Sequence, residues 1–163
     1  MYAQSVPFLI RNLEATTKFL KKAESAFDAR KIDKAVVLQT RIFPDMFPLL
    51  RQVLLVSDFC KGSGARLAGV AVPSYTDDEK TFEDLYARLA KTVDFLKSLD
   101  AKAFEGADKR NITMKVQGND MTMDGITYFN GMALPNIYFH MTTAYNILRS
   151  IGVELGKGDF MGR

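Results

Sequence analysis

The sequence predicts an all-α protein: a bundle of four long helices, with one small β-hairpin between the third and the fourth. Two observations lead to this prediction. Four stretches carry apolar residues at the three- and four-residue spacing that places them on one face of a helix. One stretch alternates apolar and polar residues, as a strand does. The length suits one core, so residues 1–163 are expected to form a single domain.

The composition indicates a soluble protein. Apolar residues make up 47% and charged residues 25%, and no apolar run approaches the roughly 20 residues that cross a bilayer, so we expect no membrane contact. The formal net charge is +3 and basic residues alternate with acidic ones, so nucleic acid is not an expected partner. A lone Cys60 and a start unlike a signal peptide favour a cytoplasmic location.

The first helix is expected from Ala3 to about Phe27. Pro7 is best tolerated in a first turn, which places the true start of the helix near Ser5. Residues 28–43 have a mixed pattern and are expected to form a connector with one short helical turn.

The second and third helices carry start and stop signals. We expect Asp45 or a neighbouring residue to cap the second helix, Pro48 to lie in its first turn and Gly69 to end it. The acidic run at 76–79 suits the positive end of a helix dipole, which places the start of the third helix there. An apolar stripe then continues to Leu99.

Alternation between residues 111 and 129 predicts the hairpin, with Gly118 and Asn119 in its turn, since both residues accept positive φ. Pro135 is expected to open the last helix and Gly152 to end it. The tail beyond Gly152 is too rich in glycine for a helix.

The candidate functional residues centre on His140, the one histidine, on the apolar face of the last helix. Ser57 and Asp58 are polar residues within the apolar sequence of the second helix, and packing of this helix against the last one would bring them toward His140. An imidazole oriented by a carboxylate serves general bases and metal ligands. The alternative is a buried hydrogen bond that fixes helix register. Cys60 is better explained as a small core residue than as a nucleophile, although Lys61 would lower its pKa if both faced a pocket.

Three parts of the chain have a recognisable pattern: His140 to Arg149 with the glycines that follow, the Pro-Asp-Met-Phe-Pro-Leu segment at 44–49, and segments 57–62 and 65–69. Through these segments the chain resembles an uncharacterised family of the DinB/YfiT-like four-helix superfamily. The resemblance implies a bundle in up-down-down-up order that is often dimeric. The resemblance also implies that relatives in the superfamily bind a divalent metal through three histidines, one on the second helix and two a turn apart on the last.

Only His140 matches that metal pattern. Ala144 stands one turn further on, and the second helix has no histidine, so we expect no metal and no cofactor. We predict His140 and Asp58 as catalytic residues. The predicted ligand-binding residues are Ser57, Lys61, Arg66 and Tyr145.

These residues lead to three hypotheses. The first is a homodimeric bundle protein that binds a small molecule in the former active-site cleft. The second is a residual enzyme, of transferase or hydrolase type, in which His140 acts as a base or as the ligand of a recruited metal. The third is a structural or scaffolding protein.

Overall fold

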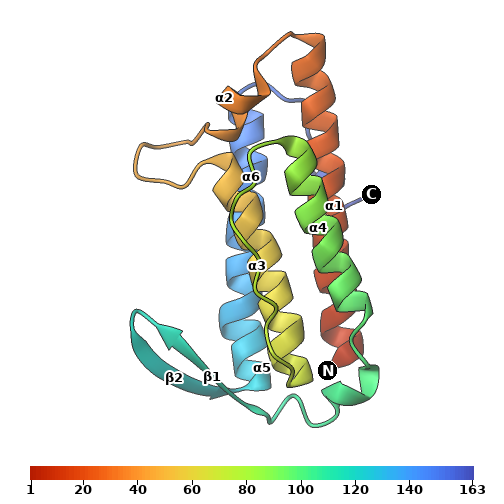
Figure 1. The fold of residues 1–163 in the computed structure, drawn as a ribbon. Helices are drawn as coiled ribbons and strands as arrows, with labels where there is room; N and C mark the ends of the chain where they lie inside the picture. The colour runs from red at the N-terminus through yellow and green to blue at the C-terminus, as the bar shows by residue number, and fades with distance from the viewer.

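The computed structural model describes residues 1–163 and shows four long helices side by side (Figure 1). These are α1 (Tyr2–Ala29), α3 (Leu49–Ala68), α4 (Phe82–Lys97) and α6 (Leu134–Ser150). Along the chain, α1 runs up in the view of Figure 1, α3 and α4 run down, and α6 runs up again. The predicted up-down-down-up four-helix bundle is therefore confirmed. None of the helices is long and apolar enough to cross a bilayer.

Short elements fill the connections between the long helices. They are α2 (Lys34–Leu38), a 3-10 turn (Ala101–Phe104), β1 (Asn111–Val116), β2 (Asn119–Asp124), α5 (Gly125–Tyr128), a π-helical turn (Phe129–Ala133) and α7 (Lys157–Phe160). The two strands pair antiparallel and form the predicted hairpin between the third and fourth long helices.

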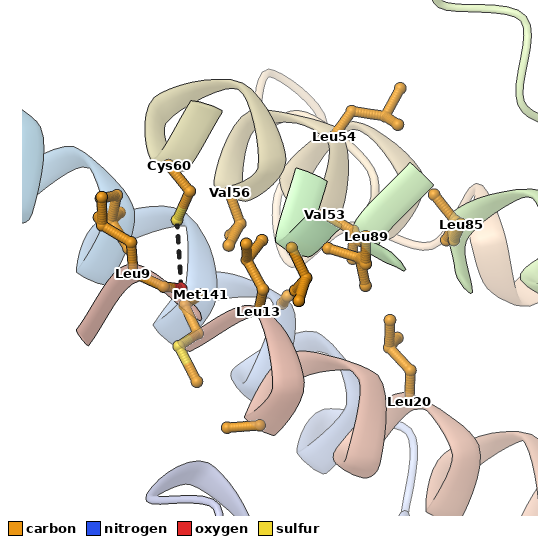
Figure 2. Close-up of a cluster of buried hydrophobic side chains, with 14 of the residues drawn as sticks. Leu9, Leu13, Leu20, Val53, Leu54, Val56, Cys60, Leu85, Leu89 and Met141 are labelled. Carbon is orange, nitrogen blue, oxygen red and sulfur yellow. Dashed lines mark hydrogen bonds between the residues drawn. The ribbon is translucent and has the colours of Figure 1, made fainter. Parts of the chain in front are cut away.

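Each long helix turns one apolar stripe toward a common core (Figure 2). Fully buried side chains from the four helices include Leu13, Val53, Leu89 and Met141. Cys60 also lies in this core, where its Sγ is 3.9 Å from the Leu9 carbonyl oxygen. Burial raises the pKa of the Cys60 thiol. Cys60 is thus a core residue, as expected.

A long crossover joins α3 to α4, because these neighbours run in the same direction. A helix of 20 residues such as α3 is about 30 Å long, and residues 70–80, here called the strap, return along it without regular structure. Gly69 ends α3 in the left-handed conformation, with φ of 70°, as predicted. Residues 71–80 make no backbone–backbone hydrogen bond, so side chains alone hold most of the strap.

Three helix starts differ from the predictions. α1 begins at Tyr2 rather than near Ser5, and Pro7 lies inside it. α3 begins at Leu49 after Pro48, so Asp45 does not cap it. α4 begins at Phe82, because the acidic run at 76–79 pairs with cations of the bundle instead.

Thr81 caps α4 in a reciprocal capping box. Its Oγ1 accepts a hydrogen bond from the Asp84 amide at 3.1 Å, and Asp84 Oδ2 accepts one from the Thr81 amide at 2.9 Å. We expect Thr81→Ala to lower the free energy of unfolding by about 1 kcal/mol in urea titrations. Thr81→Ser keeps the hydroxyl and should lose far less; equal losses in the two variants would contradict the capping role.

The hairpin turn lies one residue earlier than predicted. Gln117 and Gly118, with φ of 51° and 86°, occupy the two central positions, and Asn119 already belongs to β2. Two positive φ angles match the right-handed twist of the flanking strands. Ile112 is buried and Met123 packs against the core, so one face of the hairpin is covered by the bundle, as expected.

The last long helix, α6, begins at Leu134 with Pro135 in its first turn, as predicted. Helical backbone that was not predicted precedes it: Asp124 Oδ1 accepts a hydrogen bond from the Thr127 amide at the start of α5, and the π-helical turn connects α5 to α6. Gly152 ends α6 with φ of 85°, as predicted. The tail is also more ordered than predicted. The tail forms α7 despite its glycines, because Asp159 accepts the Gly156 N–H at 2.7 Å.

Candidate functional site

His140 projects from α6 toward α3, and its hydrogen bond defines its tautomer. His140 Nδ1 lies 2.8 Å from Gln52 Oε1, while Gln52 Nε2 donates to the Phe47 carbonyl oxygen at 3.0 Å. Since the amide nitrogen is committed as a donor, Oε1 is the acceptor and Nδ1 must carry the proton. Neutral His140 therefore keeps its lone pair on Nε2.

Two phenyl rings flank the imidazole. It stacks on Phe59 of α3, with centroids 5.6 Å apart, and meets Phe139 edge-on at 5.2 Å. His140 is only 8% exposed, yet its Nε2 has no protein partner and is not among the sealed polar atoms. It is therefore a hydrogen-bond acceptor that reaches solvent beside apolar surface.

Burial and, second, the positive charge of Arg51 lower the pKa of His140. The imidazole is consequently neutral at pH 7. Arg51 itself is held by Asp77, whose Oδ2 lies 2.5 Å from Arg51 Nη1, and this bond lowers the pKa of Asp77.

The lowered pKa of His140 predicts a pH-dependent stability. Below the ordinary value of 6.5 the unfolded chain binds a proton that the folded chain resists, so the free energy of unfolding should fall as the pH drops through 6.5. The slope should not exceed about 1.4 kcal/mol per pH unit. Urea titrations of wild type and His140→Asn between pH 8 and pH 5 isolate this contribution as a difference. A difference that stays constant across the series would contradict it.

The donors around His140 do not fit the three-histidine metal site of the superfamily. The chain has one histidine, Ala144 stands one turn further along α6, and the facing residue on α3 is Gln52. No three histidine, cysteine, aspartate or glutamate side chains lie together as a metal site would require.

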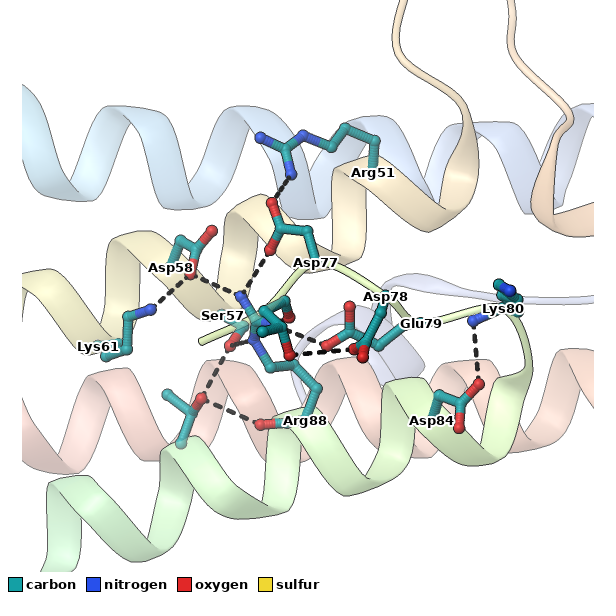
Figure 3. Close-up of polar contacts among 12 residues, drawn as sticks. Arg51, Ser57, Asp58, Lys61, Asp77, Asp78, Glu79, Lys80, Asp84 and Arg88 are labelled. Atoms are coloured by element: carbon teal, nitrogen blue, oxygen red, sulfur yellow. Dashed lines mark hydrogen bonds and ion pairs between the residues drawn. The ribbon is translucent and has the colours of Figure 1, made fainter. Parts of the chain in front are cut away.

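Asp58 and Ser57 lie in a different cluster, centred on Arg88 of α4 (Figure 3). Arg88 Nη2 is 2.9 Å from Asp58 Oδ1, Nη1 is 2.7 Å from Glu79 Oε1, and Nε donates to Ser57 Oγ at 3.3 Å. The expected contact of Asp58 or Ser57 with His140 is therefore absent.

Four further contacts complete this cluster. Lys61 Nζ lies 2.8 Å from Asp58 Oδ1, and the Ser57 and Thr92 hydroxyls are 2.8 Å apart. Arg88 also reaches the Thr76 carbonyl oxygen and Asp77 Oδ1 on the strap. Burial opposes the charge on Arg88, but Asp58 and Glu79 outweigh it and raise the pKa of Arg88.

A hollow of about 330 Å³ opens beside the cluster and is lined mostly by strap and α4 residues, among them Tyr75, Glu79, Arg88 and Lys91. The Tyr75 ring has three cations close to it: Lys61 at 4.0 Å, Lys91 at 4.3 Å and Arg88 at 4.8 Å from its centroid. These cation–π contacts hold the strap against α3 and α4.

Arg66 and Tyr145 lie away from both groups. Arg66 Nη1 donates to the Tyr128 hydroxyl at 3.3 Å, and the Tyr145 hydroxyl donates to the Leu155 carbonyl oxygen at 3.2 Å. Both contacts fasten neighbouring segments to the bundle. A ligand role for either residue stays a prediction.

Sequence reasoning missed Gln52 and Arg88, although a signal was present. Both are polar residues at buried positions of otherwise apolar stripes, Gln52 beside Val53 and Arg88 beside Leu89. A polar side chain in such a stripe must find a partner, so each of these residues indicates a buried polar contact. Partners of Arg88 on the irregular strap could not be read from helical periodicity.

The sequence matches the family described as Domain of unknown function (DUF1993) over residues 1–161. The fold is similar to that of a crystal structure of a DinB family member protein from Shewanella denitrificans, with a TM-score of 0.93 and 34% identity. The match covers 99% of this chain and 92% of that chain. No curated protein matches the sequence.

Proposed function

This chain belongs to the DUF1993 family and has a DinB-like fold, and from the geometry of its site we propose that it binds a small molecule at His140. The family's description assigns no activity. The proposed binding does not use the three-histidine metal of the superfamily. The single observation behind the proposal is the solvent-reaching Nε2 of a His140 whose Nδ1 is committed to Gln52. A buried imidazole that served only to fix helix register would need no accessible lone pair.

The surroundings of Nε2 suggest the ligand class. Phe139 is 60% exposed next to the acceptor, and Arg51 adds positive charge nearby. A neutral or anionic molecule with an aromatic or aliphatic body and an N–H or O–H donor fits this combination. Its donor would bond to Nε2 while its body packs on Phe139.

A second candidate is a residual enzyme in which His140 accepts a proton, since its free lone pair is on the accessible nitrogen. Two features weigh against this. Gln52, an amide, orients the ring where a carboxylate would strengthen the base, and the lowered pKa makes the imidazole a weaker base. Asp58 is engaged with Arg88 and Lys61, so it cannot assist as placed.

The test is a fragment screen observed through the His140 ring nitrogens by ¹⁵N NMR. The free protein should show the Nδ1–H tautomer, and aromatic fragments bearing an N–H or O–H donor should shift the Nε2 resonance. An Nε2–H tautomer in the free protein would contradict the site geometry, and a library without any hit would contradict binding.

Two variants separate ligand binding from packing. His140→Asn can still donate to Gln52 but lacks the Nε2 acceptor, so it should fold and lose the hits. Gln52→Leu removes the tautomer constraint and should weaken the hits through the mixed tautomer population. Hits that persist in His140→Asn would place the ligand elsewhere. Turnover of any hit that disappears in His140→Ala would favour the enzyme instead.

We also expect the protein to act as a homodimer. The segment between α2 and α3 leaves Ile42, Phe43 and Phe47 at least half exposed, more apolar surface than a short loop needs. Sedimentation equilibrium should give a dimer for wild type and a monomer for Phe43→Ser. Met121→Ser, a matched change on the hairpin, should remain dimeric; a monomeric wild type would refute the proposal.

A further inference from the structure

The strap covers a groove that carries excess positive charge. On the bundle side, α3 and α4 contribute Arg51, Lys61, Arg88 and Lys91 against the single carboxylate of Asp58. On the strap side, Asp77, Asp78 and Glu79 follow one another in sequence. Asp84, which also lines the hollow, is committed to the amides of Lys80 and Thr81. The acidic run of the strap thus neutralises the cations beneath it.

The N–H groups of Arg88 bond partly to α3, inside the bundle, and partly to the strap. Its side chain is 3% exposed and all five N–H groups can be assigned. Two go to Ser57 and Asp58 on α3, and three go to the strap, at the Thr76 carbonyl, Asp77 and Glu79. If the strap left, three N–H groups would point at the space that its carboxylates now fill.

The strap is attached to the bundle through side-chain contacts and not through backbone pairing. Residues 71–80 make no backbone–backbone hydrogen bond, and Val70 and Val72 are exposed. The strap also satisfies its own polar groups incompletely. The Glu79 side chain is only 9% exposed, and its Oε2 is buried without any hydrogen-bond partner. Since no backbone–backbone hydrogen bond ties residues 71–80 to the bundle, the position of the strap depends on side-chain partners that a competing ligand could take over.

We propose that the groove under the strap is a binding site for a small carboxylate- or phosphate-bearing molecule, and that Asp77 and Glu79 occupy it as an internal ligand. A planar carboxylate or a phosphate can accept two parallel N–H bonds from a guanidinium, where Asp77 and Glu79 now accept one bond each from Arg88. Lys61 and Lys91 add charge, and a hollow of about 330 Å³ between the strap and α4 already opens beside Arg88. Its central residue, Arg88, makes no contact with His140, although Arg51, which pairs with Asp77 of the strap, also acts on the charge of His140.

The experiment measures inorganic phosphate binding by calorimetry at constant ionic strength, with sodium chloride as the balancing salt. Wild type should bind weakly, because the strap competes. Asp77→Asn/Glu79→Gln removes the charge of the internal ligand and should bind phosphate at least about tenfold more tightly. Asp120→Asn/Glu105→Gln, the same charge change on exposed carboxylates elsewhere, should bind as wild type does. Equal affinity in the two double variants, or no binding to either, would overturn the proposal.

Displacement of the strap is measured separately by ¹⁹F NMR. The variant Val72→Cys is labelled with a trifluoromethyl tag, while buried Cys60 stays unlabelled. Phosphate, but not chloride, should shift and narrow the tag signal; binding without that change would contradict displacement.

Further variants test the residues of the site. Lys91→Gln should weaken phosphate binding several-fold, and unchanged affinity would count against the site. If the double strap variant fails to fold, Asp77→Asn alone, at a 42% exposed side chain, must still tighten binding. His140→Asn should leave phosphate affinity unchanged, which separates this result from the proposal at His140.

Discussion

Replacing Arg88 with methionine is expected to lower the free energy of unfolding by about 3–5 kcal/mol, because it removes one partner of a buried ion cluster. Glu79 has no other partner and is nine-tenths buried, so its carboxylate would be left charged without compensation. Asp58 would keep Lys61, which limits the loss on that side. Ser57 would lose one of its two hydrogen bonds.

Urea unfolding of Arg88→Met provides the measurement. Arg41→Met is the matched control, since Arg41 is exposed and makes no ion pair, and it should change stability by less than about 0.5 kcal/mol. Adding Glu79→Gln to Arg88→Met should recover part of the loss, because it removes the stranded charge. If Arg88→Met proved as stable as the Arg41 control, the cluster would contribute little to the fold.

Gly125→Ala is expected to destabilise the protein by more than about 3 kcal/mol, for a steric reason. Gly125 is buried at the start of α5, where a Cβ atom would overlap the backbone carbonyl oxygen of Ala107. The two segments are also joined by the Ile126 amide, which donates to the Asp108 carbonyl oxygen at 3.0 Å. Because the obstructing atom is backbone, no side-chain rotation can relieve the contact.

Gly131→Ala is the control for this prediction. Gly131 lies in the π-helical turn with open space where a Cβ would stand, so alanine should be neutral or slightly stabilising. Thermal or urea unfolding of both variants distinguishes the steric effect from a general gain in helix propensity. A Gly125→Ala protein of wild-type stability would show that the loop at Ala107 can move away.

The helices and the hairpin could be predicted because their signals are local. A stripe of apolar residues at helical spacing must be buried wherever the partner helices come from, which is why the stripes through Val53 and Leu89 were predicted correctly. Helix starts were less predictable. The acids at 76–79 suit a helix N-terminus equally well, but pairing with Arg51 and Arg88 competes for the same carboxylates and wins here.

The partners of polar residues were the least predictable feature of the candidate site. Periodicity placed His140 on the apolar face of its helix and Asp58 within an apolar stretch, but the direction of each around its helix decides which neighbour it meets. His140 meets Gln52 across the α3–α6 interface, while Asp58 faces α4 and meets Arg88. No local pattern connects residues that lie on separate helices.

The sequence by itself therefore determined which segments form the four long helices, where the hairpin lies, and that one histidine cannot build a three-histidine site, because these follow from composition and short-range spacing. The tertiary structure alone decided the tautomer of His140 and the association of the strap with Arg88. Both depend on groups that are far apart in the chain, 88 residues in the case of His140 and Gln52, and that only the packed bundle brings within hydrogen-bonding distance.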